Sequence, residues 1–289
     1  MAGILDRYGI KEVADVTFYR IDKDTAQPAE PVLYLDTLKV STIEQTAETT
    51  DARGGKGNPK LVTWDYGKDI TVTLEDALFS AKSLSIMFGN GKVVKSTEEV
   101  KRTVMARLDT EGVLGKVAID VYDAETKGAI RKKLAISEFT ANGATLVGVY
   151  DEDGTEISAT TETVGEGSEA VTTTSYKGDA NERVFVTYTI KTNNQNQIII
   201  SADTFPGTYY VTGDTYARSD VDGSDQFFQF IIQKAKVTSE NTITLEAEGD
   251  PSVFNMNLSV LRPEDGEMMK LVQYDLAALE EEEEKKDEE

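Results

Sequence analysis

The sequence predicts a mainly β protein, a β-sandwich or barrel with one flanking α-helix and a long loop before that helix. Short runs in which apolar and polar residues alternate recur along most of the chain, as in strands with one buried face. Clusters of Asp, Gly, Asn and Ser separate these runs, which indicates turns between strands. Only one segment shows a clear helical spacing of apolar residues. The 289 residues are enough for one large β domain or two modest ones.

The N-terminal region predicts two strands, at residues 13–21 and 32–40, separated by a stretch that contains Pro28 and Pro31. Residues 43–60 then become polar and rich in glycine, and they end in the sequence Arg53-Gly-Gly-Lys-Gly-Asn-Pro-Lys60. Such a segment cannot form a core strand or helix, so we expect a long loop or the tip of a hairpin. A strand at Leu61–Val72, which contains the only tryptophan, Trp64, should follow it.

The predicted helix covers residues 74–88. Thr73 is a suitable N-cap, and the acids that follow it would lie in the first turn, where they complement the helix dipole. Gly89-Asn90-Gly91 suits a left-handed C-terminal cap. The apolar residues recur at steps of three and four and would form one face: Leu74, Ala77, Leu78, Ala81, Leu84 and Phe88.

The middle of the chain returns to short alternating runs. Val100–Leu108 fits both a helix face and a loose strand alternation, and a strand is preferred. Asp151–Asp179 is rich in Thr, Glu, Gly and Ser, which predicts a turn followed by a mobile surface loop. The other expected strands of this region are Val117–Tyr122, Leu134–Phe139, Thr145–Tyr150 and Val184–Ile190.

The last third of the chain is again β-like, with turns rich in Asp, Gly and Ser. A short helical segment is expected at Met268–Leu279, and an acidic tail follows at Glu280–Glu289. The predicted strands are Gln197–Ala202, Gly207–Thr212, Gln226–Ile232, Thr242–Ala247 and Val253–Leu261.

Composition excludes several classes of function. The chain has 30 Lys and Arg against 52 Asp and Glu, a formal net charge of −22, which disfavours a grip on DNA because nucleic-acid affinity comes mainly from cationic side chains. It contains neither cysteine nor histidine, which removes the commonest metal ligands and the usual nucleophile–base pairs. Residues 1–20 do not resemble a secretory signal, and no apolar stretch could span a bilayer. We therefore expect no cofactor, no membrane partner, and assembly in a cytoplasm.

Three acidic or glycine-rich clusters could carry chemistry. The segment Arg53–Lys60 does not fit the GxxxxGK[ST] pattern of a phosphate loop, and a flexible tip that reaches another subunit suits it better. Asp151-Glu152-Asp153-Gly154 lacks the later ligands of a calcium loop, and hairpin-turn chemistry explains it. The same explanation covers a second cluster, which consists of Asp214, Asp220, Asp222 and Asp225. We expect no catalytic or metal-ligating residue.

Two blocks of sequence resemble the tail tube (major tail) protein family of tailed bacteriophages. The first block runs from Ala52 to Lys68 and continues at Leu74–Ser80. The second block consists of Phe205–Tyr210, Gly213–Tyr216, Phe227–Ile232, Leu245–Phe254 and Leu261–Pro263.

The resemblance implies a β domain of tail-tube type whose sheets join between neighbouring subunits into a ring, usually six-fold, and rings that stack into a channel for DNA ejection. This domain would consist of residues 1–109 and 183–279. Residues 110–182 match nothing in the family and would be an inserted β-rich segment that decorates the tube. The implied partners are copies of the chain itself, a tail sheath protein, a baseplate and a tail terminator, while DNA passes without specific binding.

The predicted protein is thus a structural component of the virion tail and not an enzyme. Another virion component, such as a baseplate, collar, tail-terminator ring or head decoration protein, is the nearest alternative, and a glycosidase with a carboxylate pair is a weaker one. The residues expected to contact a neighbouring subunit are Arg53, Gly54, Gly55, Lys56, Gly57, Asn58, Pro59, Lys60 and Trp64.

Overall fold

The computed structural model describes residues 7–89, 91–123, 125–164, 171–192, 194–238, 243 and 252–274. It is mainly β, with sheets in a sandwich-like arrangement, so the predicted fold class is confirmed. One α-helix is found in these residues, α1 at Ala81–Phe88. No helix of the described residues combines the length and the apolar character that a membrane crossing requires.

The chain divides into two compact units. The first consists of residues 1–94 and 197–289, and the second of residues 95–196. The second unit is wider than the segment 110–182 expected from the sequence. The reason is that β7 (Val100–Arg107) and β13 (Arg183–Ile190) pair with each other over their whole length and share a sheet with β10 (Ala144–Tyr150).

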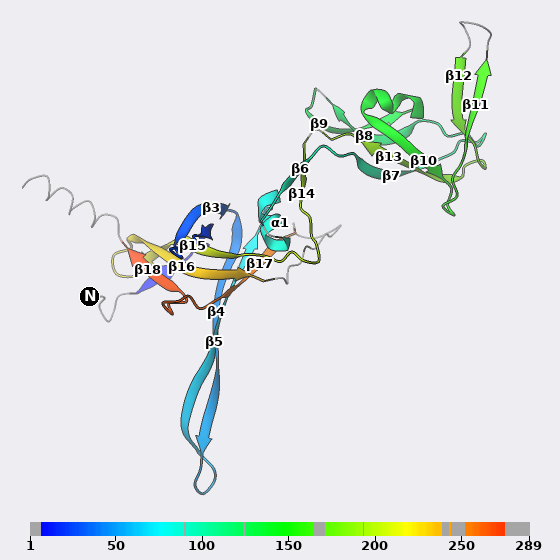
Figure 1. Ribbon diagram of the computed structural model, residues 1–289. Helices are drawn as coiled ribbons and strands as arrows, with labels where there is room; N and C mark the ends of the chain where they lie inside the picture. The colour runs from blue at the N-terminus through cyan, green and yellow to red at the C-terminus, as the bar shows by residue number, and fades with distance from the viewer. Residues whose placement is uncertain are drawn as a thin grey trace, which may run out of the picture. The chain divides into compact units, whose positions relative to one another are not determined.

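The first unit is built on a nine-stranded sheet with the order β3-β2-β15-β16-β17-β5-β4, in which β1 also pairs with β15 and β18 with β16 (Figure 1). All of these pairings are antiparallel. A separate pair of short strands, β6 (Val94–Ser96) and β14 (Gln195–Gln197), lies where the chain passes from one unit to the other. The strands of the large sheet are β1 (Tyr8–Ile10), β2 (Asp15–Ile21), β3 (Pro28–Leu35), β4 (Leu38–Arg53), β5 (Lys60–Asp76), β15 (Thr208–Ser219), β16 (Asp225–Val237), β17 (Phe254–Val260) and β18 (Lys270–Tyr274).

Alternation along the strands builds the core of the first unit, because successive side chains point to opposite faces of a sheet. Gly213 lies opposite Phe230 in the paired strands β15 and β16, and the ring of Phe230 occupies the space that a side chain at residue 213 would need. The completely buried apolar side chains of this core are Val16, Phe18, Val72, Leu74, Ile86, Val211, Ile232, Ala235, Val237 and Leu258.

The predicted helix at residues 74–88 begins seven residues later than expected. Its N-cap is Ser80, not Thr73, and Ser80 and Ser83 form a capping box in which each side chain accepts a hydrogen bond from the backbone N–H of the other residue. Leu74 instead belongs to the end of β5, where it pairs with Met256 of β17 and is completely buried. The strand alternation ends at residue 76 and the helical spacing starts at residue 74, so the two patterns overlap in the sequence, and pairing with β17 decided between them.

Most of residues 43–60, where we expected a long loop or the tip of a hairpin, is a strand instead. It forms the outer part of β4, which pairs with β5 from Leu38↔Asp76 to Arg53↔Lys60. The polar composition was correctly interpreted as excluding a core strand, since residues 44–50 are all exposed. A strand can nevertheless form there because β5 satisfies its backbone hydrogen bonds. Only the turn at residues 54–59 is a hairpin tip.

The second unit has three sheets and its own core. The strand order is β10-β13-β7 in one sheet, and β8 (Val117–Asp123) pairs with β9 (Gly128–Leu134) in another. The third is the hairpin of β11 (Ala159–Val164) and β12 (Val171–Tyr176). Two short 3₁₀ turns follow β9, at Ile136–Glu138 and Thr140–Asn142. The buried side chains of this core are Leu108, Val117, Ile119, Val121, Leu134, Phe139, Ala144, Val149, Val184, Val186 and Tyr188.

Several smaller expectations were also tested. The expected strand Leu134–Phe139 is wrong, because β9 ends at Leu134 and the 3₁₀ turns carry Phe139 into the core. The loop expected at Asp151–Asp179 contains the β11–β12 hairpin. The expected strand Gln197–Ala202 is present only as the last residue of β14. The strands that are confirmed are those predicted at Val100–Leu108, Val117–Tyr122, Thr145–Tyr150, Val184–Ile190, Gly207–Thr212, Gln226–Ile232 and Val253–Leu261.

The helical segment predicted at Met268–Leu279 is a strand where it is described, β18, which pairs with β16. Its short apolar run does not distinguish a helix from a strand, and the free edge of β16 selected the strand. The acidic tail lies outside the described residues, as do residues 275–279 and the strand predicted at Thr242–Ala247 apart from Ile243.

Candidate subunit interface

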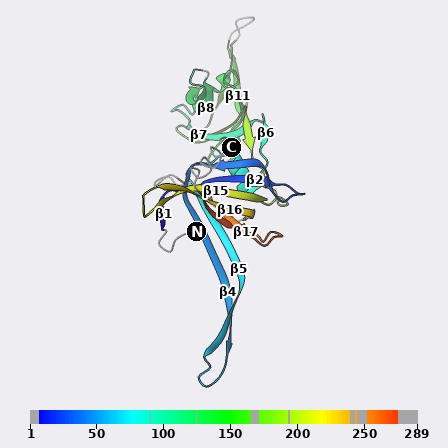
Figure 2. The ribbon, with the colours of Figure 1, turned by 90° about the vertical axis from the view of Figure 1, so that its left-hand side faces the viewer.

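The β4–β5 hairpin has a buried root and an exposed outer part. At the root, β5 pairs with β17 from Phe254↔Asp76 to Ser259↔Thr71, and its side chains alternate into the core. Beyond Asp69, the two strands pair only with each other among the described residues. Figures 1 and 2 show this outer ribbon projecting from the sheet of the first unit. A two-stranded ribbon alone is marginally stable in water, so its length predicts that something packs against it.

A bulge separates the root of the hairpin from the outer ribbon. Thr46 pairs with Asp69 and Glu48 pairs with Tyr66, so β5 has one more residue than β4 between these pairs. Gly67 lies at this place with φ of +60°, a left-handed conformation that glycine adopts without the steric cost other residues bear. Bulges bend a strand and increase its twist. The bulge therefore helps to set the direction of the outer ribbon relative to the sheet.

Three apolar side chains line one side of the outer ribbon. Val62, Trp64 and Tyr66 alternate along β5 and therefore share a face, which we call the aromatic face. Trp64 is 54% exposed and Tyr66 is 52% exposed. Large exposed apolar patches are typical of interaction sites, and Trp and Tyr are enriched in protein interfaces. The residues opposite them on β4 are Ala52, Thr50 and Glu48.

The predicted contact residues 53–60 form the tip of the hairpin. Arg53 ends β4 and Lys60 begins β5, and the backbone N–H of Gly54 donates to the carbonyl of Pro59 at 3.3 Å. Gly55 and Gly57 have φ of +83° and +86°, which explains why the turn is rich in glycine. The structure thus places the tip residues and Trp64 on one outer ribbon. Whether they contact a neighbouring subunit stays a prediction.

Asp51 organises the base of this tip. Its carboxylate lies 2.7 Å from Nζ of Lys60 and 3.3 Å from Nη2 of Arg53, and it accepts a hydrogen bond of 2.8 Å from the hydroxyl of Thr63. Two of the three cations that the sequence offers for a neighbouring subunit are therefore engaged within their own hairpin. Lys56, at the turn itself, makes no ion pair with any described residue.

The Asp51 cluster predicts a pH dependence of the tip. The hydrogen bond with Lys60, followed by those with Thr63 and Arg53, lowers the pKa of Asp51 below the ordinary carboxyl value. A depressed folded-state pKa means that the stabilisation is present above the ordinary pKa and is lost as the pH falls through the lowered value. We expect NMR titration to show a low pKa for Asp51 and a loss of tip order in the same acidic range. Thr63→Val should raise this pKa, and an unchanged value would contradict the assigned contacts.

Sequence reasoning did not single out Val62 and Tyr66, which share the exposed face of the outer ribbon with Trp64. A signal was available, because the facing segment Glu44–Thr50 contains no apolar residue larger than alanine. When the apolar residues of a strand alternate and the paired strand has no large apolar residues, the apolar face has nothing to pack against in that hairpin and is exposed to solvent. Reading β4 as a loop concealed this, since no partner strand was then expected.

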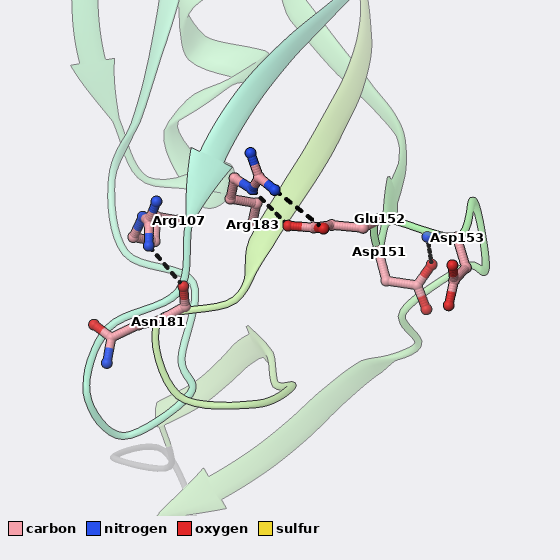
Figure 3. Close-up of polar contacts among 6 residues, drawn as sticks. All are labelled: Arg107, Asp151, Glu152, Asp153, Asn181 and Arg183. Atoms are coloured by element: carbon pink, nitrogen blue, oxygen red, sulfur yellow. Dashed lines mark hydrogen bonds and ion pairs between the residues drawn. The ribbon is translucent and has the colours of Figure 1, made fainter.

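The first acidic cluster of the sequence is explained by turn and ion-pair contacts in the second unit (Figure 3). The carboxylate of Asp151 accepts hydrogen bonds from the backbone N–H groups of Asp153 and Thr155, at 3.0 and 2.7 Å. Glu152 turns away from it and forms a two-pronged ion pair with Arg183, at 2.5 and 3.3 Å. The carboxylates diverge, which does not suit a shared calcium ion.

The second acidic cluster is likewise held by local partners. Asp225 forms a two-pronged ion pair with Arg218, with both distances at 2.6 Å. Hydrogen bonds from Ser219 and Ser224 lower the pKa of Asp222 to about 2. Asp214 lies elsewhere on β15 and accepts a hydrogen bond from the amide of Gln229 at 2.6 Å. Within the described ranges, no three acidic side chains gather closely enough to hold a metal ion.

The family model described as the YomU/Tube protein family matches residues 8–273, nearly the whole chain. The chain belongs to the YomU/Tube protein family. This family is of the phage tail tube type, so the resemblance found in the sequence is confirmed. No curated protein gives a match to the chain.

Membership of the YomU/Tube family has direct consequences for function. It indicates a tail or tube protein of a phage, which implies a structural role and a place in the virion. The match continues through the second unit, residues 95–196, where the sequence alone offered no resemblance.

Proposed function

We propose that the chain is the self-assembling subunit of a phage tail tube, with copies that join into rings and rings that stack into the channel for DNA ejection. One observation carries the proposal beyond family membership. The outer ribbon of the β4–β5 hairpin exposes Trp64 and Tyr66 although it has no packing partner among the described residues. A single copy leaves this surface incomplete, and a second copy would complete it.

The edges of the large sheet support the ring. Its strand order ends in β3 on one side and β4 on the other, so each presents an edge that no described strand covers. An uncovered edge is a template for pairing with another chain. A contact between different surfaces of two copies generates a ring when the rotation closes. We propose closure at six copies, as the tail-tube resemblance implies.

The charge of the chain suits a passage for DNA. Asp15 of β2 lies directly opposite Asp214 of β15. Asp15 accepts a hydrogen bond from Tyr34 at 3.1 Å and lies on the face opposite the buried Val16. Like charges directly opposite each other are destabilising, so their presence favours a functional use. We propose that this face lines the channel, where acidic side chains offer DNA no counterion-releasing contact.

The proposal is tested by concentrating the purified protein and imaging it by negative-stain electron microscopy. Rings or tubes of one constant diameter are expected, because the exposed hairpin and sheet edges find their partners on other copies. The matching solution measurement is sedimentation velocity over the same concentrations. A protein that stays a single subunit at every concentration would overturn the proposed function.

The hairpin tip gives a sharper prediction. Lys56→Ser should shorten the tubes without changing the fold, because Lys56 is the tip cation that no described carboxylate engages. Replacing Arg53 and Lys60 as well would also release Asp51 and disturb the tip itself. Lys23→Ser, an exposed change in the turn between β2 and β3, is the control. Tubes of equal length in both variants would remove the tip from the interface.

A further inference from the structure

An open groove lies at the root of the β4–β5 hairpin, in the first unit. It has a volume of about 610 Å³, which is in the range of clefts that hold a ligand or several side chains. One wall is the inner part of the hairpin and the other is the segment that leads into β18. The lining residues include Ile43, Lys68, Ile70, Met268, Met269 and Leu271.

The groove has an apolar floor and two cations, of which Lys270 is paired with Glu267 of the same lining. Ile70 is buried at its base, while Ile43 and Leu271 are partly open to solvent, Leu271 being 60% exposed. Two adjacent methionines add flexible side chains that adapt to an incoming shape. Lys68 stands at the rim and makes no ion pair with a described residue. The groove therefore suits an apolar, aromatic partner that carries a nearby carboxylate.

We propose that this groove receives the aromatic face of a second copy of the chain, with Trp64 and Tyr66 entering the apolar floor. This inference rests on the proposed self-assembly and names the surface that receives the hairpin. The charges are complementary, because Glu48 lies directly opposite Tyr66 on the ribbon and makes no ion pair with a described residue. On docking, Glu48 of one copy approaches Lys68 of the other.

Trp64 cannot reach the groove of its own chain. Trp64 lies six residues beyond Ile70 on the same paired strand, a separation of roughly 20 Å at about 3.3 Å per residue. A paired ribbon does not fold back over that distance. The donor and acceptor surfaces are therefore different parts of the same molecule, and contact between them is head-to-tail. Such a contact repeats from copy to copy, as a ring or stacked assembly requires.

The natural absence of cysteine allows a direct test by disulfide formation. Val62→Cys places a thiol on the aromatic face and leaves both rings intact, and Leu271→Cys places one in the groove. We expect a mixture of these two full-length variants, concentrated and mildly oxidised, to give disulfide-linked dimers as the main product. Leu61→Cys with Leu271→Cys is the matched control, because Leu61 lies on the opposite face of the same strand.

A second pair of variants tests the groove without crosslinking. Leu271→Asp should prevent assembly because it puts a charge on the apolar wall, whereas Leu78→Asp, an equally exposed leucine outside the groove, should not. Tubes that form in Leu271→Asp, or an oxidised mixture of the two cysteine variants that assembles without the 62–271 disulfide, would overturn the groove assignment and leave the proposed function standing. An unsubstituted protein that never self-associates would overturn both.

Discussion

Trp64→Ser is expected to abolish assembly while the subunit stays folded. Trp64 is half-exposed on a ribbon that lies outside the core, so its loss should cost the single subunit little. In an interface, a buried tryptophan is among the residues whose truncation costs most, about 2 kcal/mol or more. Every copy in a tube would lose that contact. We expect rings and tubes to disappear from electron micrographs at concentrations where the unsubstituted protein forms them.

The same residue reports on its own burial. Trp64 is the only tryptophan of the chain, so its emission should shift to the blue as copies associate and water leaves the ring. Trp64→Phe keeps a large apolar ring and should retain assembly, while the exposed change Phe205→Ser elsewhere in the first unit should have no effect. Tubes of normal abundance in Trp64→Ser would show that the aromatic face does not hold copies together.

Phe18→Ala is expected to destabilise the first unit by about 3–5 kcal/mol, the usual cost of removing a buried phenylalanine ring. Phe18 is completely buried on β2 and packs edge-on against Tyr209, with ring centroids 5.9 Å apart. The neighbouring strands cannot collapse fully into the space left behind. Urea denaturation followed by circular dichroism should show the transition of this unit at a clearly lower urea concentration.

The controls for this variant use both units. Phe205→Ala removes the same side chain from an exposed position, 64% exposed, and should leave the midpoint nearly unchanged. The second unit has a separate core around Phe139 and Tyr188, so its transition should not move in Phe18→Ala. A common shift of both transitions would contradict the description of two units with separate cores.

Strand positions were largely predictable because alternation is a local property of the sequence. The patterns at Val117–Tyr122 and Val184–Ile190 needed no knowledge of partners. Errors occurred where two patterns overlap or where the pattern is weak. Leu74 fits both a strand and a helix, and the run at Met268–Leu279 is too short to choose. In both places the free edge of a neighbouring strand, β17 or β16, decided the outcome.

The position of the candidate interface in the chain could be predicted from the sequence. The contacts of its charged side chains could not. Glycine and lysine at residues 53–60 pointed to an outward tip, and the structure places them at the end of a long ribbon. The tip cations were expected to be free, yet Asp51 engages Arg53 and Lys60. Asp51 and Arg53 lie on β4 and Lys60 lies on β5, and no sequence pattern could reveal the contact between the two strands while β4 was read as a loop.

The sequence by itself determined the β class, the tail-tube resemblance and the unsuitability of the chain for histidine or cysteine chemistry. These follow from composition and from local periodicity, which need no partner. Only the tertiary structure decided which apolar residues are left without a core, namely Val62, Trp64 and Tyr66, and where a groove of matching character lies. Those properties depend on which strands pair, and pairing joins residues that are distant in the chain.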